Sequence, residues 1–377
     1  MKKACLFFAI SLFIIILFAS SSFATVEPVE TPDVKIIIDG EITVYKDIPL
    51  SINQRTFLPL REILKNLGVP DDDEHIVWNR SDASVTIYKD STKIFLQIGS
   101  KTAYVNDATI MLDVAPIGYT NQRIYIPARF VSQILGKKVV WDGSSNSVYI
   151  RGADEYYQAE EILRKSEAAM NFVSKAVIDA NMQLQISKTG VEKRYDIDMQ
   201  TNIDKIGKLM YMTTKVPFLK KVLDFEIYYA NSMEYSKDPF SSKWTVNEIT
   251  DQAFKKMLDD NLNLSVINDN DVLCAGLIRV DDNLTNEILL KGCIFPKNIF
   301  SRIKAGFGIK SLKLRKYDIE ISLDRNTYRI NRLAAVVEGG YASTEGNYSL
   351  TSKVESVYKD FNGSFDIIVP PELKEIK

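Results

Sequence analysis

One segment of this 377-residue sequence occurs twice, and this repetition restricts the possible folds more than any other feature. Residues 55–68 read RTFLPLREILKNLG and residues 123–136 read RIYIPARFVSQILG, an offset of 68. Both copies follow Asn-Gln and lead into Val-Trp and then Val-x-Ile, although the first copy carries an acidic insertion before its Val-Trp. So many matches at a fixed offset indicate one supersecondary unit that is present twice.

Each copy has the pattern of two strands, a short helix and a further strand. A hairpin with a tight turn precedes each helix, a proline begins the helix, and a glycine follows its last residue. The strand after each tryptophan alternates apolar and polar residues, as a half-buried strand does. The predicted hairpins span residues 35–45 and 103–111, the helices lie between Pro59 and Gly68 and between Pro127 and Gly136, and the strands lie near Val85 and Val148. The sequence therefore predicts tandem ββαβ units of the α+β class.

This order of elements, with N-x-R, P-x-R, L-G, V-W and V-x-I at matching places, resembles the copper amine oxidase N-terminal domain, or stalk domain, over residues 34–152. Amine oxidase catalysis needs a separate domain with three histidine copper ligands and a quinone made from tyrosine. The sequence holds one histidine, His75, in an acidic run that we expect to be a solvated loop. The resemblance therefore implies only the accessory module of exported bacterial proteins, with no cofactor and no metal site.

Arg61 and Arg129 occupy the same place in the two copies, two residues after the proline. Arginine suits recognition of a carboxylate or a sugar acid. Structural pairing with a carboxylate such as Asp39 or Asp142 explains the twin placement equally well, and we favour that interpretation.

Residues 1–24 have the features of a secretory signal peptide. Lys2 and Lys3 precede an uncharged run, and Ser22-Phe23-Ala24 places small residues where signal peptidase cleaves. The alternative is an uncleaved anchor, since the uncharged stretch is long enough to span a bilayer. We expect cleavage, export and no transmembrane segment in the mature chain.

Composition narrows the function classes. The chain has 47 basic and 49 acidic side chains, a net charge of −2, so there is no basic excess for binding nucleic acid. No nucleophile elbow is present, and a His-Glu-x-x-His motif is excluded by the single histidine. Carboxylate pairs for glycoside hydrolysis cannot be located from sequence, because their separation is a property of the fold.

Two cysteines, Cys274 and Cys293, follow the predicted signal peptide. An exported chain can oxidise such a pair to a disulfide. Two buried thiols that pack as small apolar side chains are the equally weighted alternative. A metal site is not expected, because no further cysteine or histidine completes one.

Residues 155–377 change in character to one long helix, period-two strands, central helices and more strands. The predicted helices span residues 157–177, 248–262, 283–291 and 297–304, and the predicted strands span residues 182–186, 195–199, 209–213, 225–235, 317–323, 329–338, 348–358 and 364–369. A mostly antiparallel β domain with packing helices is expected.

This element order, with Ala169-Met170 in the opening helix and Phe365, Ile367 and Pro370 in the closing run, resembles the lipoprotein-carrier superfamily of LolA- and LppX-like proteins. The resemblance implies a half-barrel around helices, with an apolar concave face that holds acyl chains. The ligand-binding candidates on one face are Tyr195, Ile197, Met199, Phe225, Ile227 and Tyr229. The alternative is that they only pack on the helices.

Three functional hypotheses follow. The first is a secreted, non-enzymatic envelope protein, whose stalk module attaches to a cell-wall component or an envelope protein and whose β domain binds an apolar or lipid-like ligand. The second is a cell-wall hydrolase that uses carboxylates of the C-terminal domain, which two close carboxylates with raised pKa would favour. The third is a purely structural surface protein.

Overall fold

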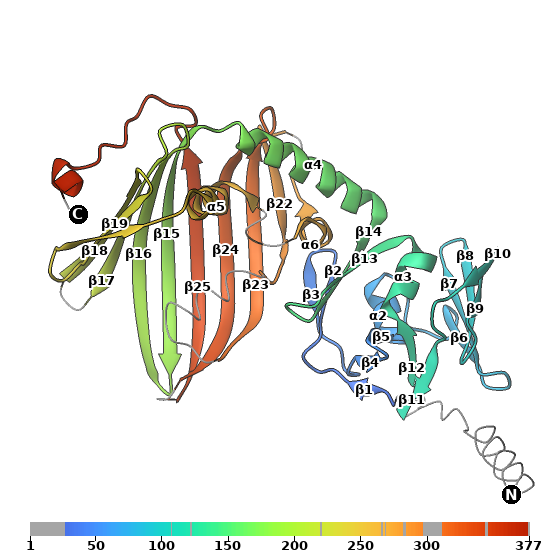
Figure 1. Cartoon of the computed structure of the whole chain (residues 1–377). Coiled ribbons are helices and arrows are strands. Elements are labelled where there is room, and N and C mark those ends of the chain that lie inside the picture. The colour runs from blue at the N-terminus through green and yellow to red at the C-terminus, as the bar shows by residue number, and fades with distance from the viewer. Residues whose placement is uncertain are drawn as a thin grey trace, which may run out of the picture.

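The computed structural model describes residues 27–106, 108–120, 123–218, 221–264, 267, 269–281, 284–296, 311–343 and 346–375. The α+β class is confirmed, with mostly β structure and a large sheet that curls as a half-barrel (Figure 1). The predicted signal peptide and the predicted helix at 297–304 lie outside the described residues. No helix among the described residues is long and apolar enough to cross a membrane.

The N-terminal part, residues 27–152, contains three small sheets and two short helices. The first sheet has the strand order β1 (Val29–Glu30), β4 (Leu50–Ile52), β5 (Arg55–Pro59), β12 (Arg123–Pro127) and β11 (Ile117–Tyr119). The second sheet has the order β10 (Ala108–Met111), β9 (Thr102–Val105), β8 (Thr92–Gln97), β7 (Ser84–Lys89) and β6 (Ile76–Asn79). The third sheet has the order β13 (Lys137–Asp142), β14 (Ser147–Gly152), β2 (Lys35–Ile38) and β3 (Glu41–Thr43). Helix α2 spans Leu60–Asn66 and α3 spans Ala128–Leu135.

The repeated segments meet as neighbours at the centre of the first sheet. Strands β5 and β12 pair antiparallel, and Leu58 lies opposite Ile126, its own equivalent at the offset of 68. The two copies are therefore related by a local twofold axis through this pair. Gly136 adopts the left-handed conformation predicted for the residue that ends the helix, with φ of 61°.

The two copies are also interleaved in the outer sheets. Strand β2, from the first copy, pairs parallel with β14, the last strand of the second copy. On the other side, β9 and β10 of the second copy join β7 and β6 of the first through the intervening strand β8. Each outer sheet therefore contains strands from both copies.

Reciprocal ion pairs link the copies. Arg55 of the first lies 3.1 Å from Asp113 of the second, and Arg123 of the second lies 3.1 Å from Asp47 of the first. The arginine side chains are 43% and 53% exposed, so solvent weakens both attractions. A double-mutant cycle on Arg55 and Asp113 is expected to give a coupling of about 0.5 kcal/mol in urea unfolding, and a coupling above roughly 2 kcal/mol would contradict this.

The C-terminal part is organised by one antiparallel sheet. Its strand order is β20 (Trp244–Glu248), β19 (Met233–Lys237), β18 (Lys221–Ala230), β17 (Leu209–Phe218), β16 (Val191–Asp204), β15 (Lys175–Lys188), β25 (Gly346–Lys359), β24 (Ile330–Ser343), β23 (Ser311–Asp324), β22 (Glu287–Cys293), β21 (Ile278–Arg279). The five central strands, β16, β15, β25, β24 and β23, are each 14 residues long, which gives a strand length of about 45 Å.

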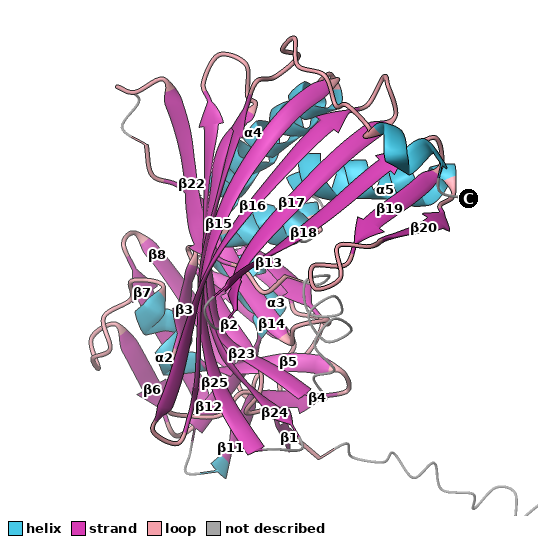
Figure 2. Ribbon diagram, turned by 90° about the vertical axis from the view of Figure 1, so that its left-hand side faces the viewer, coloured by secondary structure: helices cyan, strands magenta, loops and turns pink. Residues whose placement is uncertain are grey.

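Three helices, α4 (Ala153–Asn171), α5 (Asp251–Leu262) and α6 (Asn270–Gly276), pack on one face of this sheet (Figure 2). We call this face the inner face and the opposite one the outer face. Helix α4 buries Tyr156, Ala159, Leu163, Ser166 and Met170, which recur every three or four residues along one stripe. Figure 1 shows that α4 runs from the N-terminal part to the large sheet.

Three sequence predictions for the C-terminal part were wrong. Residues 283–291 were expected to be helical, but strand β22 occupies most of them, since Ile288 and Leu290 alternate toward the core. The predicted single strand at 225–235 is a hairpin whose turn, Asn231-Ser232, has positive φ at both residues. The predicted strand at 364–369 is an unpaired extended segment, because Phe365, Ile367 and Val369 alternate onto an apolar cluster with Tyr228 rather than joining a sheet edge.

The N-terminal and C-terminal parts meet at the tip of the β2–β3 hairpin. The backbone N–H of Cys293 donates a 2.7 Å hydrogen bond to the carbonyl oxygen of Gly40. A Cβ on Gly40 would lie 3.2 Å from the carbonyl oxygen of Gly276 and 3.4 Å from the Cα of Gly292. Three backbones therefore approach closely at positions where each residue lacks a side chain.

Buried side chains continue the same contact. The backbone N–H of Phe295 donates a 3.1 Å hydrogen bond to the hydroxyl oxygen of Tyr149, which is fully buried. Tyr149 and Ile37, from the N-terminal part, belong to the same apolar cluster as the helices and strands of the large sheet. The two parts therefore share one hydrophobic core.

Candidate ligand-binding face of the large sheet

The inner face of strands β15 to β18 is apolar along most of its length. Strand alternation and register place every second residue on this face, and Met182 lies opposite Ile197 while Leu184 lies opposite Tyr195. On the next strands, Met199 lies opposite Thr214, which in turn lies opposite Phe225.

Among the described residues, helices α4, α5 and α6 cover the end of this face that holds Ile203, Met210 and Tyr229. There, Ile203 and Met210 are buried in the core cluster, and the ring of Tyr229 lies 6.3 Å from that of Phe254 on α5. Farther along the same strands, toward the β15–β16 hairpin, the apolar side chains that belong to none of the hydrophobic core clusters of the described residues include a contiguous set of nine. We call them the apolar strip: Met182, Leu184, Ile186, Tyr195, Ile197, Met199, Val216, Leu223 and Phe225.

The six ligand-binding candidates from the sequence divide between these two regions. Tyr195, Ile197, Met199 and Phe225 lie in the apolar strip, with exposures from 8% at Ile197 to 37% at Phe225. Ile227 and Tyr229 lie at the helix-covered end and pack against its core. Burial beside Glu234 raises the pKa of Tyr229, which further marks it as a core residue.

Sequence reasoning missed three lysines at the end of the apolar strip. Lys188 is the last residue of β15 and two positions beyond Ile186, Lys193 lies opposite Ile186, and Lys221 lies opposite Phe218. We call Lys188, Lys193 and Lys221 the lysine rim. The missed signal was that period-two alternation continues from the apolar residues into these lysines. Among the described residues of β15 to β18, no inner-face position holds Asp or Glu.

One polar group on the inner face has no partner. The hydroxyl of Ser352 on β25 lies opposite Leu184, is buried, and makes no hydrogen bond in the structure. Leaving such a group unsatisfied costs roughly 1–3 kcal/mol.

The outer face of the same strands is polar. It carries a shallow depression of about 490 Å³ lined by residues such as Asp179, Asn181 and Asp198, and the amide of Asn181 donates to the Asp198 carboxylate at 3.0 Å. Among the described residues, every carboxyl group whose pKa is shifted has a lowered pKa. At Asp179, for example, hydrogen bonds from Lys359 and Gln200 stabilise the carboxylate and lower its pKa. A general acid with a raised pKa is therefore not found among them.

The cysteines are two buried free thiols rather than a disulfide. Burial raises the pKa of Cys293 to about 11 and that of Cys274 to about 12. Both are protonated near neutral pH and serve as small apolar core residues.

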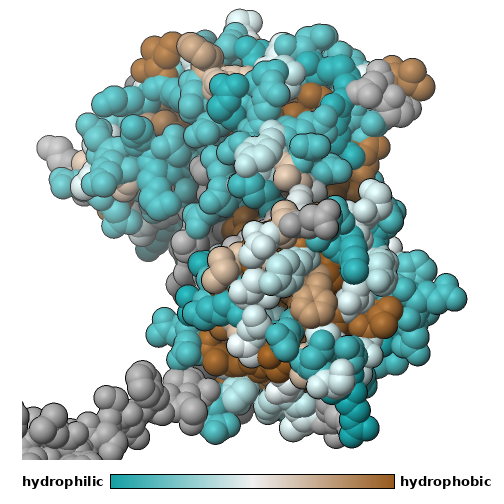
Figure 3. Space-filling view, turned by 90° about the vertical axis from the view of Figure 1, so that its right-hand side faces the viewer, coloured by the Kyte–Doolittle hydropathy of each residue, from teal (hydrophilic) through white to brown (hydrophobic). Residues whose placement is uncertain are grey.

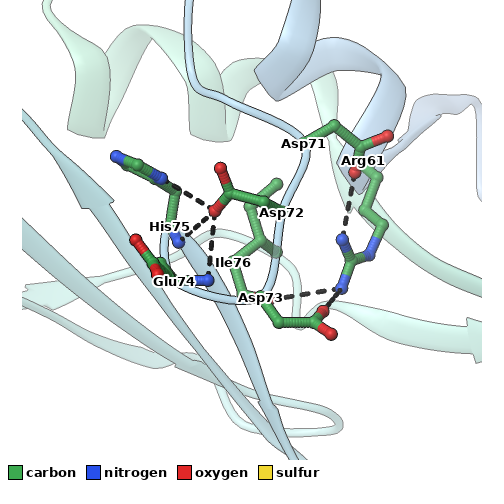
Figure 4. A network of polar contacts seen from close by, with 7 residues as sticks. All are labelled: Arg61, Asp71, Asp72, Asp73, Glu74, His75 and Ile76. Atoms are coloured by element: carbon green, nitrogen blue, oxygen red, sulfur yellow. Dashed lines mark hydrogen bonds and ion pairs between the residues drawn. The ribbon is translucent and has the colours of Figure 1, made fainter.

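A second concave region lies in the N-terminal part, beside Arg61. It has a volume of about 430 Å³ and includes Trp78, Lys46 and Arg123 in its lining. Arg61 donates to Asp71 at 3.0 Å and to Asp73 at 3.2 Å, so its charge is neutralised within the protein (Figure 4).

The structural interpretation of Arg61 and Arg129 agrees with these ion pairs, which involve carboxylates other than Asp39 and Asp142, the two that were named as examples. Arg61 binds the acidic insertion and Arg129 lies 3.8 Å from Asp113, whereas Asp142 accepts hydrogen bonds from nearby serines. The acidic insertion, around Asp71–Glu74, bends back over α2 and brings two of its carboxylates to Arg61. His75 lies 2.8 Å from Asp72, and its hydrogen bonds lower the pKa of that carboxyl group (Figure 4).

The sheet that contains β6 to β10 presents large apolar side chains to solvent. Val77, Tyr88, Tyr104 and Met111 are 38–65% exposed, and they alternate with buried residues such as Ile87. Figure 3 views this side of the molecule, where apolar and weakly polar residues gather over the lower part of the surface.

In the described part of the chain, no group of three or more His, Cys, Asp or Glu side chains is placed to hold a metal ion.

These features define a protein of two joined parts: an interleaved α+β module and a half-barrel whose inner face is partly covered by helices. Residues 37–150 match the family model of the copper amine oxidase N-terminal domain, which confirms the resemblance found in the sequence. No curated protein matches the chain.

Several solved structures match part of the chain with low TM-scores. One, described as an outer membrane lipoprotein-sorting protein domain from Vibrio parahaemolyticus, is 10% identical, with 56% of this chain and 95% of that chain covered and a TM-score of 0.23. A LolA superfamily protein from Nitrosomonas europaea is 8% identical, with 58% of this chain and 97% of that chain covered and a TM-score of 0.22. An uncharacterized conserved protein from Thermus thermophilus is 11% identical, with 58% of this chain and 94% of that chain covered and a TM-score of 0.25. Likenesses this weak do not decide the ligand or activity of this chain.

Proposed function

We propose that this is an exported, non-enzymatic envelope protein that binds an apolar, lipid-like ligand along the apolar strip. The observation that carries the proposal is a contiguous set of nine apolar side chains on the inner face that no described helix covers. A folded protein ordinarily buries such a surface or uses it for binding. Binding sites for small molecules are mostly lined by apolar side chains, as the apolar strip is.

The N-terminal module is proposed to attach the protein to a cell-wall component or an envelope protein. Its support is the match of residues 37–150 to the copper amine oxidase N-terminal domain, together with the exposed apolar side chains on the β6–β10 sheet. Because both parts share a core, attachment through this module would hold the ligand-binding face in a fixed orientation.

A pair of aspartate substitutions tests the ligand-binding proposal. Leu184 points to the inner face and Gln183, the preceding residue of β15, points to the outer face. Leu184→Asp is expected to weaken binding of the neutral fluorescent probe N-phenyl-1-naphthylamine at least about tenfold, because it places a charge in apolar surroundings. Gln183→Asp adds the same charge and is expected to leave binding unchanged.

Fluorescence titration and native mass spectrometry of detergent-free protein measure the two effects. Equal loss in both variants, or no probe binding by the natural protein, would contradict the proposal. Hydrolysis of cell-wall polysaccharide or peptide by the same preparation would instead favour an enzyme.

A further inference from the structure

We propose that the cavity beside Arg61 in the N-terminal module binds a neutral saccharide, one sugar ring of which stacks on the indole of Trp78. This inference rests on the proposed attachment role of the module and names the chemical class of its partner. It is carried by the lining of the cavity, whose volume of about 430 Å³ is in the usual range for small-molecule sites.

The buried part of the cavity lining is apolar. Its buried residues are Pro59, Leu60, Ile76 and Val85. Trp78 lies on the same face of its sheet as Ile76, two residues earlier on β6, and directly opposite Val85 on β7. Unlike these two neighbours, Trp78 is 40% exposed. Its indole therefore offers a ligand in the cavity a large apolar surface.

The more exposed part of the lining carries charges of both signs. The charged side chains are Lys46, Asp47, Arg61, Glu62, Lys65, Asp71 and Arg123. An ionic ligand would meet groups of its own sign here, whereas a hydroxyl group donates to a carboxylate and accepts from a guanidinium or ammonium group. A sugar combines such hydroxyls at its edge with apolar C–H faces on its ring. The mixed lining beside an exposed indole therefore suits a neutral saccharide.

The carboxylates of the lining are held in place by the fold. Glu62 accepts hydrogen bonds from the backbone N–H groups of Lys46, at 2.9 Å, and of Asp47, at 3.3 Å. The Asp47 carboxylate in turn lies 3.1 Å from Arg123. Each carboxylate keeps lone pairs for further hydrogen bonds. Because these acceptors are already positioned, a bound hydroxyl loses less affinity to the ordering of side chains.

The second copy of the repeat indicates that this polar lining is not a requirement of the fold. At the offset of 68, Phe130 takes the place of Glu62, and it is 1% exposed within the apolar core. Trp141 takes the place of Trp78 and is 49% exposed, but it lies outside the lining of this cavity. The chain therefore contains a matched pair of exposed tryptophans, one at the proposed site and one away from it.

Binding of the full chain to immobilised oligosaccharides tests the inference. Maltohexaose, mannohexaose and chitohexaose serve as neutral probes, and hexagalacturonate serves as the acidic one. The natural protein is expected to bind at least one neutral probe. Trp78→Ala should weaken that binding about tenfold, because the stacking surface is lost. Trp141→Ala is the matched control and should bind as the natural protein does.

A second variant, Glu62→Phe, introduces the residue of the second copy and should abolish binding, because it removes a fixed acceptor and fills the cavity. Melting temperatures close to that of the natural protein establish that each variant is folded. No binding of the neutral probes, tighter binding of hexagalacturonate, or equal losses in Trp78→Ala and Trp141→Ala would each overturn the inference.

Co-sedimentation with isolated bacterial cell envelopes measures the attachment role separately. If Trp78→Ala sediments as fully as the natural protein, the inference is overturned and the attachment role stands. If the natural protein does not sediment, the attachment role itself is overturned.

Discussion

Replacing Asp281 with asparagine is expected to lower the free energy of unfolding by about 3 kcal/mol, because it removes the charge at the centre of a buried ion cluster. The Asp281 side chain is 2% exposed, and Arg279 donates to both of its oxygens at 2.7 and 2.9 Å. Arg325 donates to the same carboxylate at 2.6 Å. These bonds tie the segment after β21 to the turn that joins β23 and β24. Without the carboxylate, two arginines lose their shared partner.

The same cluster makes stability depend on pH. The hydrogen bonds from Arg279, followed by those from Arg325, hold the pKa of Asp281 far below its usual value. The carboxylate therefore stabilises the fold fully above the unfolded-state pKa of about 4, and this contribution is lost as the pH falls toward the folded-state pKa. The difference between the natural protein and Asp281→Asn in urea unfolding should be largest near neutral pH and shrink below about pH 4. A difference that is constant from pH 7 to pH 3 would contradict this assignment.

Gly292→Ala is expected to destabilise the protein by a similar amount, about 3 kcal/mol, through backbone overlap at the junction. A Cβ at this position would overlap the carbonyl oxygen of Gly276 and lie 3.2 Å from the Cα of Leu277. Since these are backbone atoms, no side-chain rotation relieves the overlap, and α6 has to move away from β22. The displacement would also strain the hydrogen bond between Cys293 and Gly40.

Urea unfolding and limited proteolysis measure the effect of Gly292→Ala. Gly118→Ala is the control, since a Cβ there would meet only the Cδ1 of Ile98 at an ordinary 3.5 Å, and its effect should stay within about 0.5 kcal/mol. A Gly292→Ala variant as stable as Gly118→Ala would show that the junction tolerates a methyl group.

Local pattern was enough to predict much of this fold. The repeat identified the N-terminal family because proline, glycine and tryptophan at fixed spacing specify turns, caps and strand positions within each copy. The long strands were found because their apolar residues alternate, as at Met182, Leu184 and Ile186. Four of the six ligand-binding candidates were placed on the uncovered part of the inner face for the same reason.

Other features depend on contacts between distant residues, which local pattern does not encode. Strand β22 alternates over only seven residues, and its short apolar spacing also suits a helix turn. The Asp71 and Asp73 partners of Arg61 depend on how the insertion bends back over α2. Whether Tyr229 is core or ligand surface depends on where α5 crosses the sheet, and the lysine rim emerges only when three strands are aligned.

The interleaving of the two copies has a consequence for the origin of the N-terminal module. A polypeptide with a single copy would lack the β14 strand that pairs with β2 and the β12 strand that pairs with β5. Two such polypeptides around a twofold axis would supply these strands to each other, as in an isologous homodimer. The module thus has the architecture of an ancestral dimer fused by gene duplication, in which covalent linkage removes the dependence of assembly on concentration.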